Sequence, residues 1–500
     1  MRIWVSGDRD RTVKAMNTFL RMGRAESTTD GRDCGELSST ASLPGREAGE
    51  ELPEPRPRIA LLTPYTGGNL GDAAIQDAMI ANLRLRLPQA QFSGVSLNCN
   101  NFLERHGMAA FPLCGSDIPF YKMCADWRKD AGRPATRPIQ KGLVAARIKR
   151  AINQIPVLGR YLKAIRACWE EFRHWVQGFR FLRTQDLLIV SGGGQLNEEW
   201  GGPWGQPFAL FKWALLARIA KVPYVIASVG AGKAASATSR LFLSAALRMA
   251  RYRSYRDKNS RAFAAGLLRL ASKDPIVPDL AFSLPSSEVP SHGRIRTIAH
   301  GRPIVAISPI IFAKPRFWPY QDQSLYDRYV AQMARLISQL LDRDYFLVIV
   351  CSSLVDDESI IPELLGRLDP ESEKRRAEQM CIPAITSWQD FVVSLRDADA
   401  LVVSRLHSAI LGFVADKPTV AISFDPKVDW LMEDLGQTDF LLHIRDFSVE
   451  GVIEALELIQ LRRGVVMEQI GAYRRRIRST LALQYDAVAE LAMASHRRSD

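Results

Sequence analysis

An arginine and a histidine stand two residues apart where an apolar run gives way to a predicted helix, in the stretch "VVSRLHSAI" from Val402 to Ile410. A guanidinium group can donate two parallel hydrogen bonds to a carboxylate or phosphate, and the start of a helix adds partial positive charge at the same place. An imidazole can give or take a proton near neutral pH. Arg405 and His407 therefore indicate acid–base chemistry on an anionic substrate. The alternative is that His407 only caps the helix.

The stretch "GGNLGD", Gly67 to Asp72, lies between a predicted strand and a predicted helix. Its glycines permit a sharp turn and close approach of the backbone, and amides at a helix start attract anionic or hydroxyl-rich ligands. It lacks the GxGxxG spacing of dinucleotide-binding loops and the Lys-Ser/Thr of a nucleotide P-loop. Asn69 and Asp72 are therefore candidates for substrate contact. A purely structural turn, N-capped by Asp72, is the alternative.

A second glycine-rich loop, "SGGGQLNEEWGGPWG", follows a predicted strand at 191–205. Amide and carboxylate groups beside indole faces suit a sugar, which needs hydrogen bonds at its edges and apolar surface on its flat side. The alternative is a loop whose tryptophans pack beneath it. The candidate acceptor contacts are Gly193, Gly194, Gln195, Asn197, Trp200 and Trp204.

Two further cations follow predicted strands. Arg256 stands in "SYRDKNS", where a surface ion pair with Asp257 is the alternative, and Lys427 stands in "SFDPKVDW", where a solvated loop lysine is the alternative. Together with Ser404, which precedes Arg405, they complete the predicted anion-binding set, because basic and hydroxyl groups at strand exits suit phosphate and carboxylate.

The alternation of short apolar runs with helical patterns predicts two domains with parallel sheets covered by helices on both faces. We expect two doubly wound Rossmann-like domains that face each other across a cleft, with ligands beyond the carboxyl ends of the strands. A short strand is expected near "IPAITS", residues 382–387. The expected parts are a disordered or poorly ordered tail at 1–57, an N-terminal domain at 58–290 with a basic helical insertion at about 115–183, a C-terminal domain at 296–445, and helices at 446–500 that pack back on the first domain.

Composition excludes several classes of protein. With 47% apolar and 24% charged residues the chain is globular, and no apolar run approaches the roughly 20 residues that span a bilayer. Seven cysteines, an odd number without CxxC spacing, argue against a disulfide framework and against a zinc site. A reducing cytoplasm fits this cysteine usage.

The net charge of +12 is concentrated in one segment. From Arg128 to Arg183 the chain has fourteen Lys and Arg residues against three acids, with aromatic residues between them at helical spacing. A basic amphipathic helix can lie in a membrane interface, where each cation contributes about 1 kcal/mol. We expect peripheral contact of 128–183 with an anionic membrane, at the inner face of the plasma membrane. A solvated helical lid is the alternative. No nucleic-acid-binding motif accompanies the charge, so nucleic acid is not expected.

Taken in order, the motifs resemble those of the polysaccharide pyruvyl transferase family. The resemblance spans about Arg58 to Gly436, with an interruption at the basic segment. It implies transfer of a pyruvyl group from phosphoenolpyruvate to a sugar, which forms a cyclic ketal, on a glycosyltransferase-B-like fold. The segments that carry the resemblance are "GGNLGDAAI", "IVSGGGQL", "PYVIASVGAG", "YRSYRDKNS", "PDLAF" and "VVSRLHSAILGFVADKPTVAISFDPK".

The resemblance places Arg256, Arg405 and His407 at the donor site. Phosphoenolpyruvate has a phosphate and a carboxylate, and bidentate arginines suit both groups. His407 is assigned as the acid that protonates the methylene carbon, and Asp72 as the base or as a holder of the acceptor. No cofactor and no metal are expected.

Two alternatives stay open: a nucleotide-sugar-dependent glycosyltransferase of the same architecture, and a non-catalytic saccharide-binding protein of the membrane surface. The first would usually need a ribose-binding acid in the second domain, and the sequence indicates none. The sequence does not identify the acceptor of a pyruvyl transferase. If the acceptor is a lipid-linked saccharide, a basic segment bound to the membrane would bring the cleft to it.

Overall fold

The computed structural model describes residues 56–64, 67–115, 156–199, 201–269, 273–285, 295–315, 317–318, 320–354 and 356–497. In the helix that begins at residue 156, the side chains are described from residue 166 on. Most of the predicted tail and residues 116–155 of the predicted insertion therefore lie outside the described residues.

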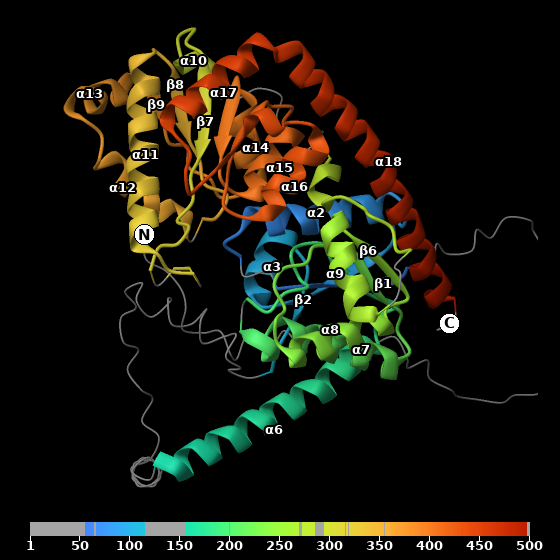
Figure 1. Ribbon diagram of the computed structural model, residues 1–500. Helices are drawn as coiled ribbons and strands as arrows, with labels where there is room; N and C mark the ends of the chain where they lie inside the picture. The colour runs from blue at the N-terminus through green and yellow to red at the C-terminus, as the bar shows by residue number, and fades with distance from the viewer. Residues whose placement is uncertain are drawn as a thin grey trace, which may run out of the picture.

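Two six-stranded parallel sheets form the centres of two domains (Figure 1). Each sheet begins at its centre, extends to one edge and then crosses to the other side, the strand order of a dinucleotide-binding fold. This confirms the predicted pair of doubly wound domains. In spatial order the first sheet contains β3 (Ala110–Pro112), β2 (Gln91–Ser96), β1 (Arg58–Thr63), β4 (Leu187–Ser191), β5 (Tyr224–Val229) and β6 (Tyr252–Tyr255). The second contains β12 (Leu441–His443), β11 (Thr419–Ser423), β10 (Ala400–Val403), β7 (Ile304–Ser308), β8 (Phe346–Ile349) and β9 (Met380–Cys381).

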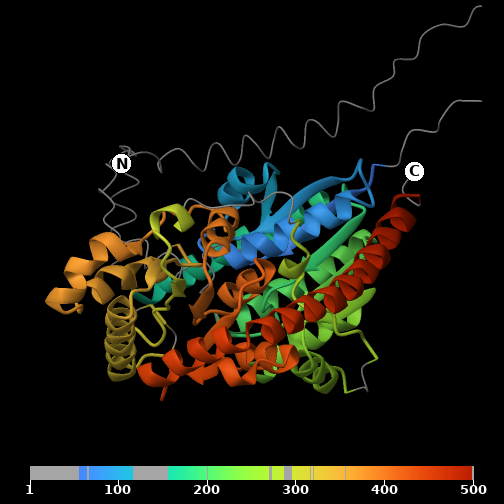
Figure 2. The same cartoon turned by 90° about the horizontal axis from the view of Figure 1, so that it is seen from above.

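Helices cover both faces of each sheet (Figures 1 and 2). Those of the first domain are α2 (Leu70–Arg84), α3 (Cys99–His106), α6 (Pro156–Leu182), η1 (Gly202–Trp204), α7 (Gln206–Ala220), α8 (Ala237–Met249), α9 (Lys258–Leu268) and η2 (Leu280–Ser283). Those that follow are α10 (Ile295–Ile298), α11 (Gln323–Asp342), η4 (Asp357–Ile360), α12 (Ile361–Leu365), α13 (Pro370–Gln379), α14 (Trp388–Arg396), α15 (Leu406–Val414), α16 (Pro426–Leu435), η5 (Thr438–Phe440), α17 (Val449–Leu461) and α18 (Arg463–His496).

Strand β1 shows why its sequence is a continuous apolar run. Ile59 and Leu61 face the core that includes α2 and α18, whereas Ala60 and Leu62 face the core beneath α6, α7 and α8. Successive side chains of a strand point to opposite faces, so a strand covered on both faces needs apolar residues throughout.

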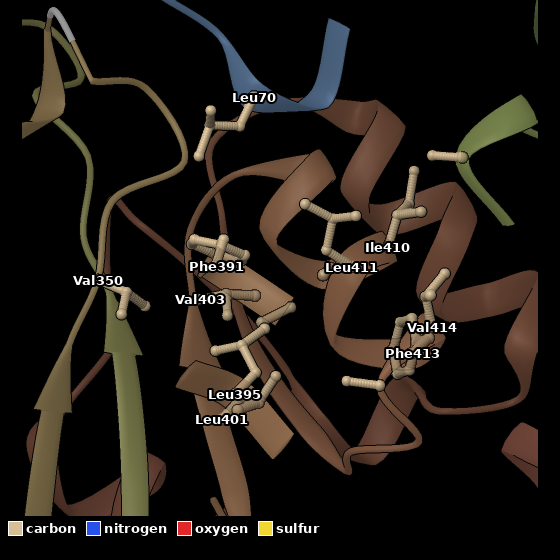
Figure 3. Packing of buried hydrophobic residues seen from close by; sticks show 14 of the residues in the cluster. Leu70, Val350, Phe391, Leu395, Leu401, Val403, Ile410, Leu411, Phe413 and Val414 are labelled. Carbon is tan, nitrogen blue, oxygen red and sulfur yellow. The ribbon is translucent and has the colours of Figure 1, made fainter. Parts of the chain in front are cut away.

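The two domains are joined where α2 begins. Leu70 N donates to Ser352 O at 2.8 Å, Leu354 N donates to Gly68 O at 2.8 Å, and Asn69 forms an antiparallel bridge with Ser353. The Leu70 side chain extends the core of the second domain toward α14 and α15 (Figure 3). The loop after β1 is thus held against the loop after β8.

The C-terminal helices divide between the domains. Helix α17 packs on α11 and β11 of the second domain, while α18 runs across to β1, β4 and α2 of the first (Figure 2). Gln484 of α18 accepts a hydrogen bond from Ser254 of β6 and donates one to Ser228 of β5 at 2.9 Å. This buried polar contact fastens α18 to the first sheet.

The short strand predicted near residues 382–387 is found directly before that stretch, where Met380 and Cys381 pair with β8 at the edge of the second sheet. No helix in the described part of the chain is both long enough and apolar enough to cross a membrane.

Candidate active site

The start of α2 presents Asp72 between the domains. Asn69 caps the helix, since its side chain accepts a hydrogen bond from Gly71 N at 2.9 Å. Asp72 therefore lies in the first turn and is not the N-cap, contrary to the alternative interpretation. Its partly buried carboxylate has no hydrogen-bond partner among the described residues. It is available to another group.

His407 lies in the first turn of α15, against Gly71 of the other domain. A side chain at Gly71 would overlap the imidazole, so only glycine allows this approach. His407 Nε2 is buried without a hydrogen-bond partner and lies 3.8 Å from Asp279 Oδ2. The side chain is 13% exposed, so it is neither sealed in a core nor a helix cap.

Asp279 connects the two domains of the site. Its side chain is 2% exposed, lies 3.3 Å from Arg256 Nη1 through Oδ2, and caps η2 by accepting from Ala281 N at 3.1 Å. Burial alone would raise the pKa of Asp279, but the imidazole of His407 and the guanidinium of Arg256 hold it at about 2. An ionised carboxylate therefore lies 3.8 Å from Nε2 of His407.

Arg256 follows β6 and is positioned by two contacts. Its guanidinium packs over Gly230, where a Cβ would lie within 3.0 Å of Nη2 and Cζ. Nη2 is buried without a hydrogen-bond partner in the described residues. The predicted alternative, a surface pair with Asp257, does not describe this arginine, because its Nε lies 3.8 Å from Asp257 while the guanidinium is buried against Asp279.

Arg405 precedes α15 and is fixed by a buried carboxylate. Asp357 accepts hydrogen bonds from Nε and, at 2.9 Å, from Nη2, and Trp318 lies under the guanidinium with 5.6 Å from Cζ to the ring centroid. Burial would lower the pKa of Arg405, but the charge of Asp357 raises it. Nη1 has no hydrogen-bond partner in the described part of the chain. The pair therefore leaves one donor group of Arg405 for a ligand.

The electrostatic environment joins these groups into one site. Burial raises the pKa of Asp72, and the charge of Asp279 raises it further, while His407, Arg405 and Arg256 act in the opposite direction. Such mutual influence requires the side chains to lie near one another. Asp72 thus keeps a proton to higher pH than an ordinary carboxyl group.

Of the other two predicted donor contacts, Lys427 lies beside the glycine loop and Ser404 lies in the core. Lys427 Nζ lies 3.3 Å from Asp425, and a Cβ on Gly194 would lie 3.8 Å from it, so the lysine reaches the glycine loop of the first domain. Ser404 is buried, and its hydroxyl lies 2.9 Å from Tyr329 Oη. The structure does not bring the Ser404 side chain into the site.

The glycine loop after β4 is held mainly by its own amide side chains. Gln195 is buried and donates to Gly192 O at 2.8 Å, and Asn197 donates to Gly194 O. These amides satisfy backbone carbonyl groups of the loop, so they are not presented to a sugar. Gly193 does face the site, because a Cβ there would lie 3.9 Å from Asp72 Oδ1.

Of the two tryptophans predicted as acceptor contacts, only Trp204 is among the described residues. Trp204 is exposed and contacts Phe208 and Phe242, with ring centroids 5.4 and 5.5 Å away. It therefore lies on the helical side of the domain and does not stack beneath the loop. Trp200 lies outside the described residues.

Two central carboxylates were not among the predicted site residues. Asp279 stands in "PDLAF", a segment that carried the family resemblance, so this signal was present in the sequence. Asp357 is a single acid among several in "VDDESI", and nothing in that spacing marks it as the partner of Arg405. In the described residues, no group of three or more His, Cys, Asp or Glu side chains is arranged to hold a metal ion.

Two facing doubly wound domains, with arginine, histidine and aspartate side chains gathered between them, define a protein of the glycosyltransferase-B-like fold class. The family model described as polysaccharide pyruvyl transferase matches residues 69–426. The chain belongs to this family, as its motifs predicted.

Solved structures with weak similarity to this chain include a sugar epimerase and a glycosyltransferase. A putative UDP-N-acetylglucosamine 2-epimerase from Listeria monocytogenes has 10% identity and a TM-score of 0.49, covering 86% of this chain and 97% of its own. The glycosyltransferase SnogD from Streptomyces nogalater has 13% identity and a TM-score of 0.48, covering 88% and 99%. Similarities this weak carry no argument about activity. The comparison with curated proteins gave no match.

Proposed function

We propose that the protein transfers the pyruvyl group of phosphoenolpyruvate to two hydroxyl groups of a sugar, forming a cyclic ketal and releasing phosphate. One observation carries the proposal: Arg256 of the first domain and His407 of the second converge on the buried carboxylate of Asp279. Cations and a proton donor from opposite domains then meet where a small dianion would lie.

Donor binding in this proposal uses the remaining donor groups of Arg256 and Arg405. Each guanidinium is already oriented by a carboxylate, Asp279 or Asp357, and each keeps a nitrogen without a hydrogen-bond partner among the described residues. Pre-oriented charge of this kind lowers the entropy cost of binding. Lys427, beside the glycine loop, supplies a further cation.

The proton transfers assign different roles to His407 and Asp72. Protonated His407 delivers its proton to the methylene carbon of the donor, and Asp279 stabilises that protonated form. A sugar hydroxyl attacks the adjacent carbon, and Asp72 accepts the hydroxyl proton. The bond to phosphate then breaks, and the second hydroxyl closes the ring.

The atoms and protons of this reaction balance without a cofactor. Of the two hydroxyl protons of the sugar, one ends on the new methyl group and the other on phosphate. His407 and Asp72 only transfer protons and return to their starting states. The raised pKa of Asp72 makes its carboxylate a stronger base for the hydroxyl proton.

The test is phosphate release from phosphoenolpyruvate in the presence of a panel of saccharides. His407→Asn should lower the rate by roughly 10²- to 10⁴-fold, the range for loss of a general acid. His443→Asn is the matched control, because His443 is exposed at the end of β12. Its rate should equal that of the wild type.

Ligand-induced stabilisation separates the proposal from its competitors. Phosphoenolpyruvate should raise the melting temperature, and Arg405→Gln should abolish that increase. A folded protein that releases no phosphate with any acceptor, and that uridine or guanosine diphosphate stabilises instead, would be a nucleotide-sugar glycosyltransferase. Glycan binding unaffected by His407→Asn and Arg405→Gln, without turnover, would indicate a saccharide-binding protein.

A further inference from the structure

Large aromatic side chains are exposed on the first domain away from the candidate active site. Trp169 is 59% exposed, Phe172 is 58% exposed and Trp204 is 54% exposed. Single exposed apolar residues are ordinary, but a contiguous group marks an interaction surface. Trp169 and Phe172 belong to α6, which extends away from both sheets (Figure 1).

The exposed rings belong to one continuous surface. Trp169 and Phe172 are stacked with centroids 5.9 Å apart. Trp175, one turn further along α6, lies 6.4 Å from Phe208, which lies 5.4 Å from Trp204. We call this surface the aromatic face. It is formed by Trp169, Phe172 and Trp175 of α6, Trp204 of η1, Phe208 of α7 and Phe242 of α8.

Arginines accompany the rings on the outer side of α6. Arg173 and Arg180 are exposed and lie four and eleven positions after Trp169, which places them on the same helical stripe as Trp169 and Phe172. The aromatic face therefore combines indole and phenyl rings with positive charge.

The acids of this part of α6 do not cancel that charge. Glu171 is paired with the buried Lys212 at 2.7 Å and faces the body of the domain. Glu170 is paired with Arg166 at 2.7 Å. Both carboxylates are neutralised within the chain, and Arg173 and Arg180 remain in excess.

We propose that the aromatic face docks on an anionic lipid surface. Rings that enter the headgroup region and cations that contact acidic headgroups are the combination that holds a helix in a membrane interface. A second copy of this chain fits less well, because a two-fold interface sets the same patch against itself. Arg173 and Arg180 would then meet their own counterparts.

The location of the face also bears on the acceptor. A single loop leads from Gly193, beside Asp72, to Trp204 on the aromatic face. If the proposed pyruvyl transfer holds, this face brings the site to saccharides carried on a lipid. The docking surface itself does not depend on that reaction.

The test is co-sedimentation of the full chain with vesicles, without donor or acceptor. Binding is expected to vesicles of equal parts phosphatidylcholine and phosphatidylglycerol, to weaken with salt, and to be slight with phosphatidylcholine alone. Trp169→Ser combined with Phe172→Ser should lower the partition coefficient at least tenfold. Arg173→Gln and Arg180→Gln should each lower it about fivefold.

The matched control is Leu461→Ser combined with Leu483→Ser. These leucines are even more exposed but lie on α17 and α18, so their replacement should leave vesicle binding unchanged. Equal loss in both double variants, or no preference for the anionic vesicles, would overturn the proposal. A wild-type dimer that becomes monomeric in Trp169→Ser/Phe172→Ser, without vesicle binding, would assign the face to self-association instead. None of these outcomes depends on phosphate release.

Discussion

Replacing Gly71 by alanine tests whether α2 positions the imidazole of His407. An added Cβ would lie closer than 3.0 Å to His407 Cβ, Cγ and Nδ1, whereas ordinary contact begins at 3.4 Å. We expect the ring to move by about 1 Å, a displacement that can lower a rate by roughly 100-fold. Overpacking of this kind also costs about 1–3 kcal/mol of the unfolding free energy.

Two measurements check this expectation: phosphate release from phosphoenolpyruvate and urea denaturation. In a His407→Gly background both the ring and its Cβ are absent, so Gly71→Ala should cost little stability there, giving a coupling energy of about 1–3 kcal/mol. Gly266 in α9 is the matched control, since a Cβ there meets no atom within 4 Å. Gly266→Ala should leave the rate unchanged and add about 0.4–1 kcal/mol to the unfolding free energy.

The reasoning would be refuted by the double variant. If Gly71→Ala destabilises the His407→Gly protein as much as the wild type, the cost does not come from contact with the side chain of His407. Full activity of Gly71→Ala would likewise show that the position of His407 does not limit the rate. Because the stability comparison needs no substrate, it remains informative even if the proposed reaction is wrong.

Three further predictions concern buried polar groups. The pKa of Asp279 is about 2 in the folded protein against an ordinary 3.8. The ionised carboxylate therefore adds roughly 2 kcal/mol to the free energy of unfolding above about pH 4, and this stabilisation is lost as the pH falls through the pKa of the folded state. Asp279→Asn should flatten the decline in urea stability between pH 5 and pH 2, and an unchanged pH profile would contradict this. Asp357→Asn leaves Arg405 without its buried partner and should lower the free energy of unfolding by about 3–5 kcal/mol. Glu450→Gln, the control in an exposed ion pair, should lower it by less than about 1 kcal/mol. Equal losses would contradict the role of Asp357 as the buried partner of Arg405. Gln484→Leu removes the hydrogen bonds that α18 makes to serines of β5 and β6 and should cost about 1–3 kcal/mol, with faster amide exchange in α18 as the second measurement.

The central strands could be predicted from the sequence because both of their faces are buried. Strands β1, β4, β7 and β10 are short apolar runs, which is a strong local signal for buried strands. Strand β2 reads "QFSGVS" and β9 has only two residues, so neither has an apolar pattern of its own. Their pairing depends on neighbours in the sheet, which local sequence does not describe.

The site was predictable to the extent that strand exits meet in a parallel sheet. Arg405 and His407 follow a strand of the second sheet and Arg256 follows a strand of the first, so the rule brings them together only because the two domains face each other. The orientation of a particular side chain needs the tertiary contacts. Ser404 precedes Arg405 yet bonds to Tyr329 within the core, because adjacent residues at a strand end point in opposite directions.

The contact between Gly68–Leu70 and Ser352–Leu354 is made by backbone atoms. Ordinary substitution of a residue leaves its amide and carbonyl groups in place, and only proline deletes the donor. The backbone pairing therefore survives most side-chain changes at this joint, although Leu70 must stay apolar because its side chain packs in the core. In divergent homologues we expect the imidazole of His407 and the carboxylate of Asp279 to keep their relative positions even where residues of this contact differ.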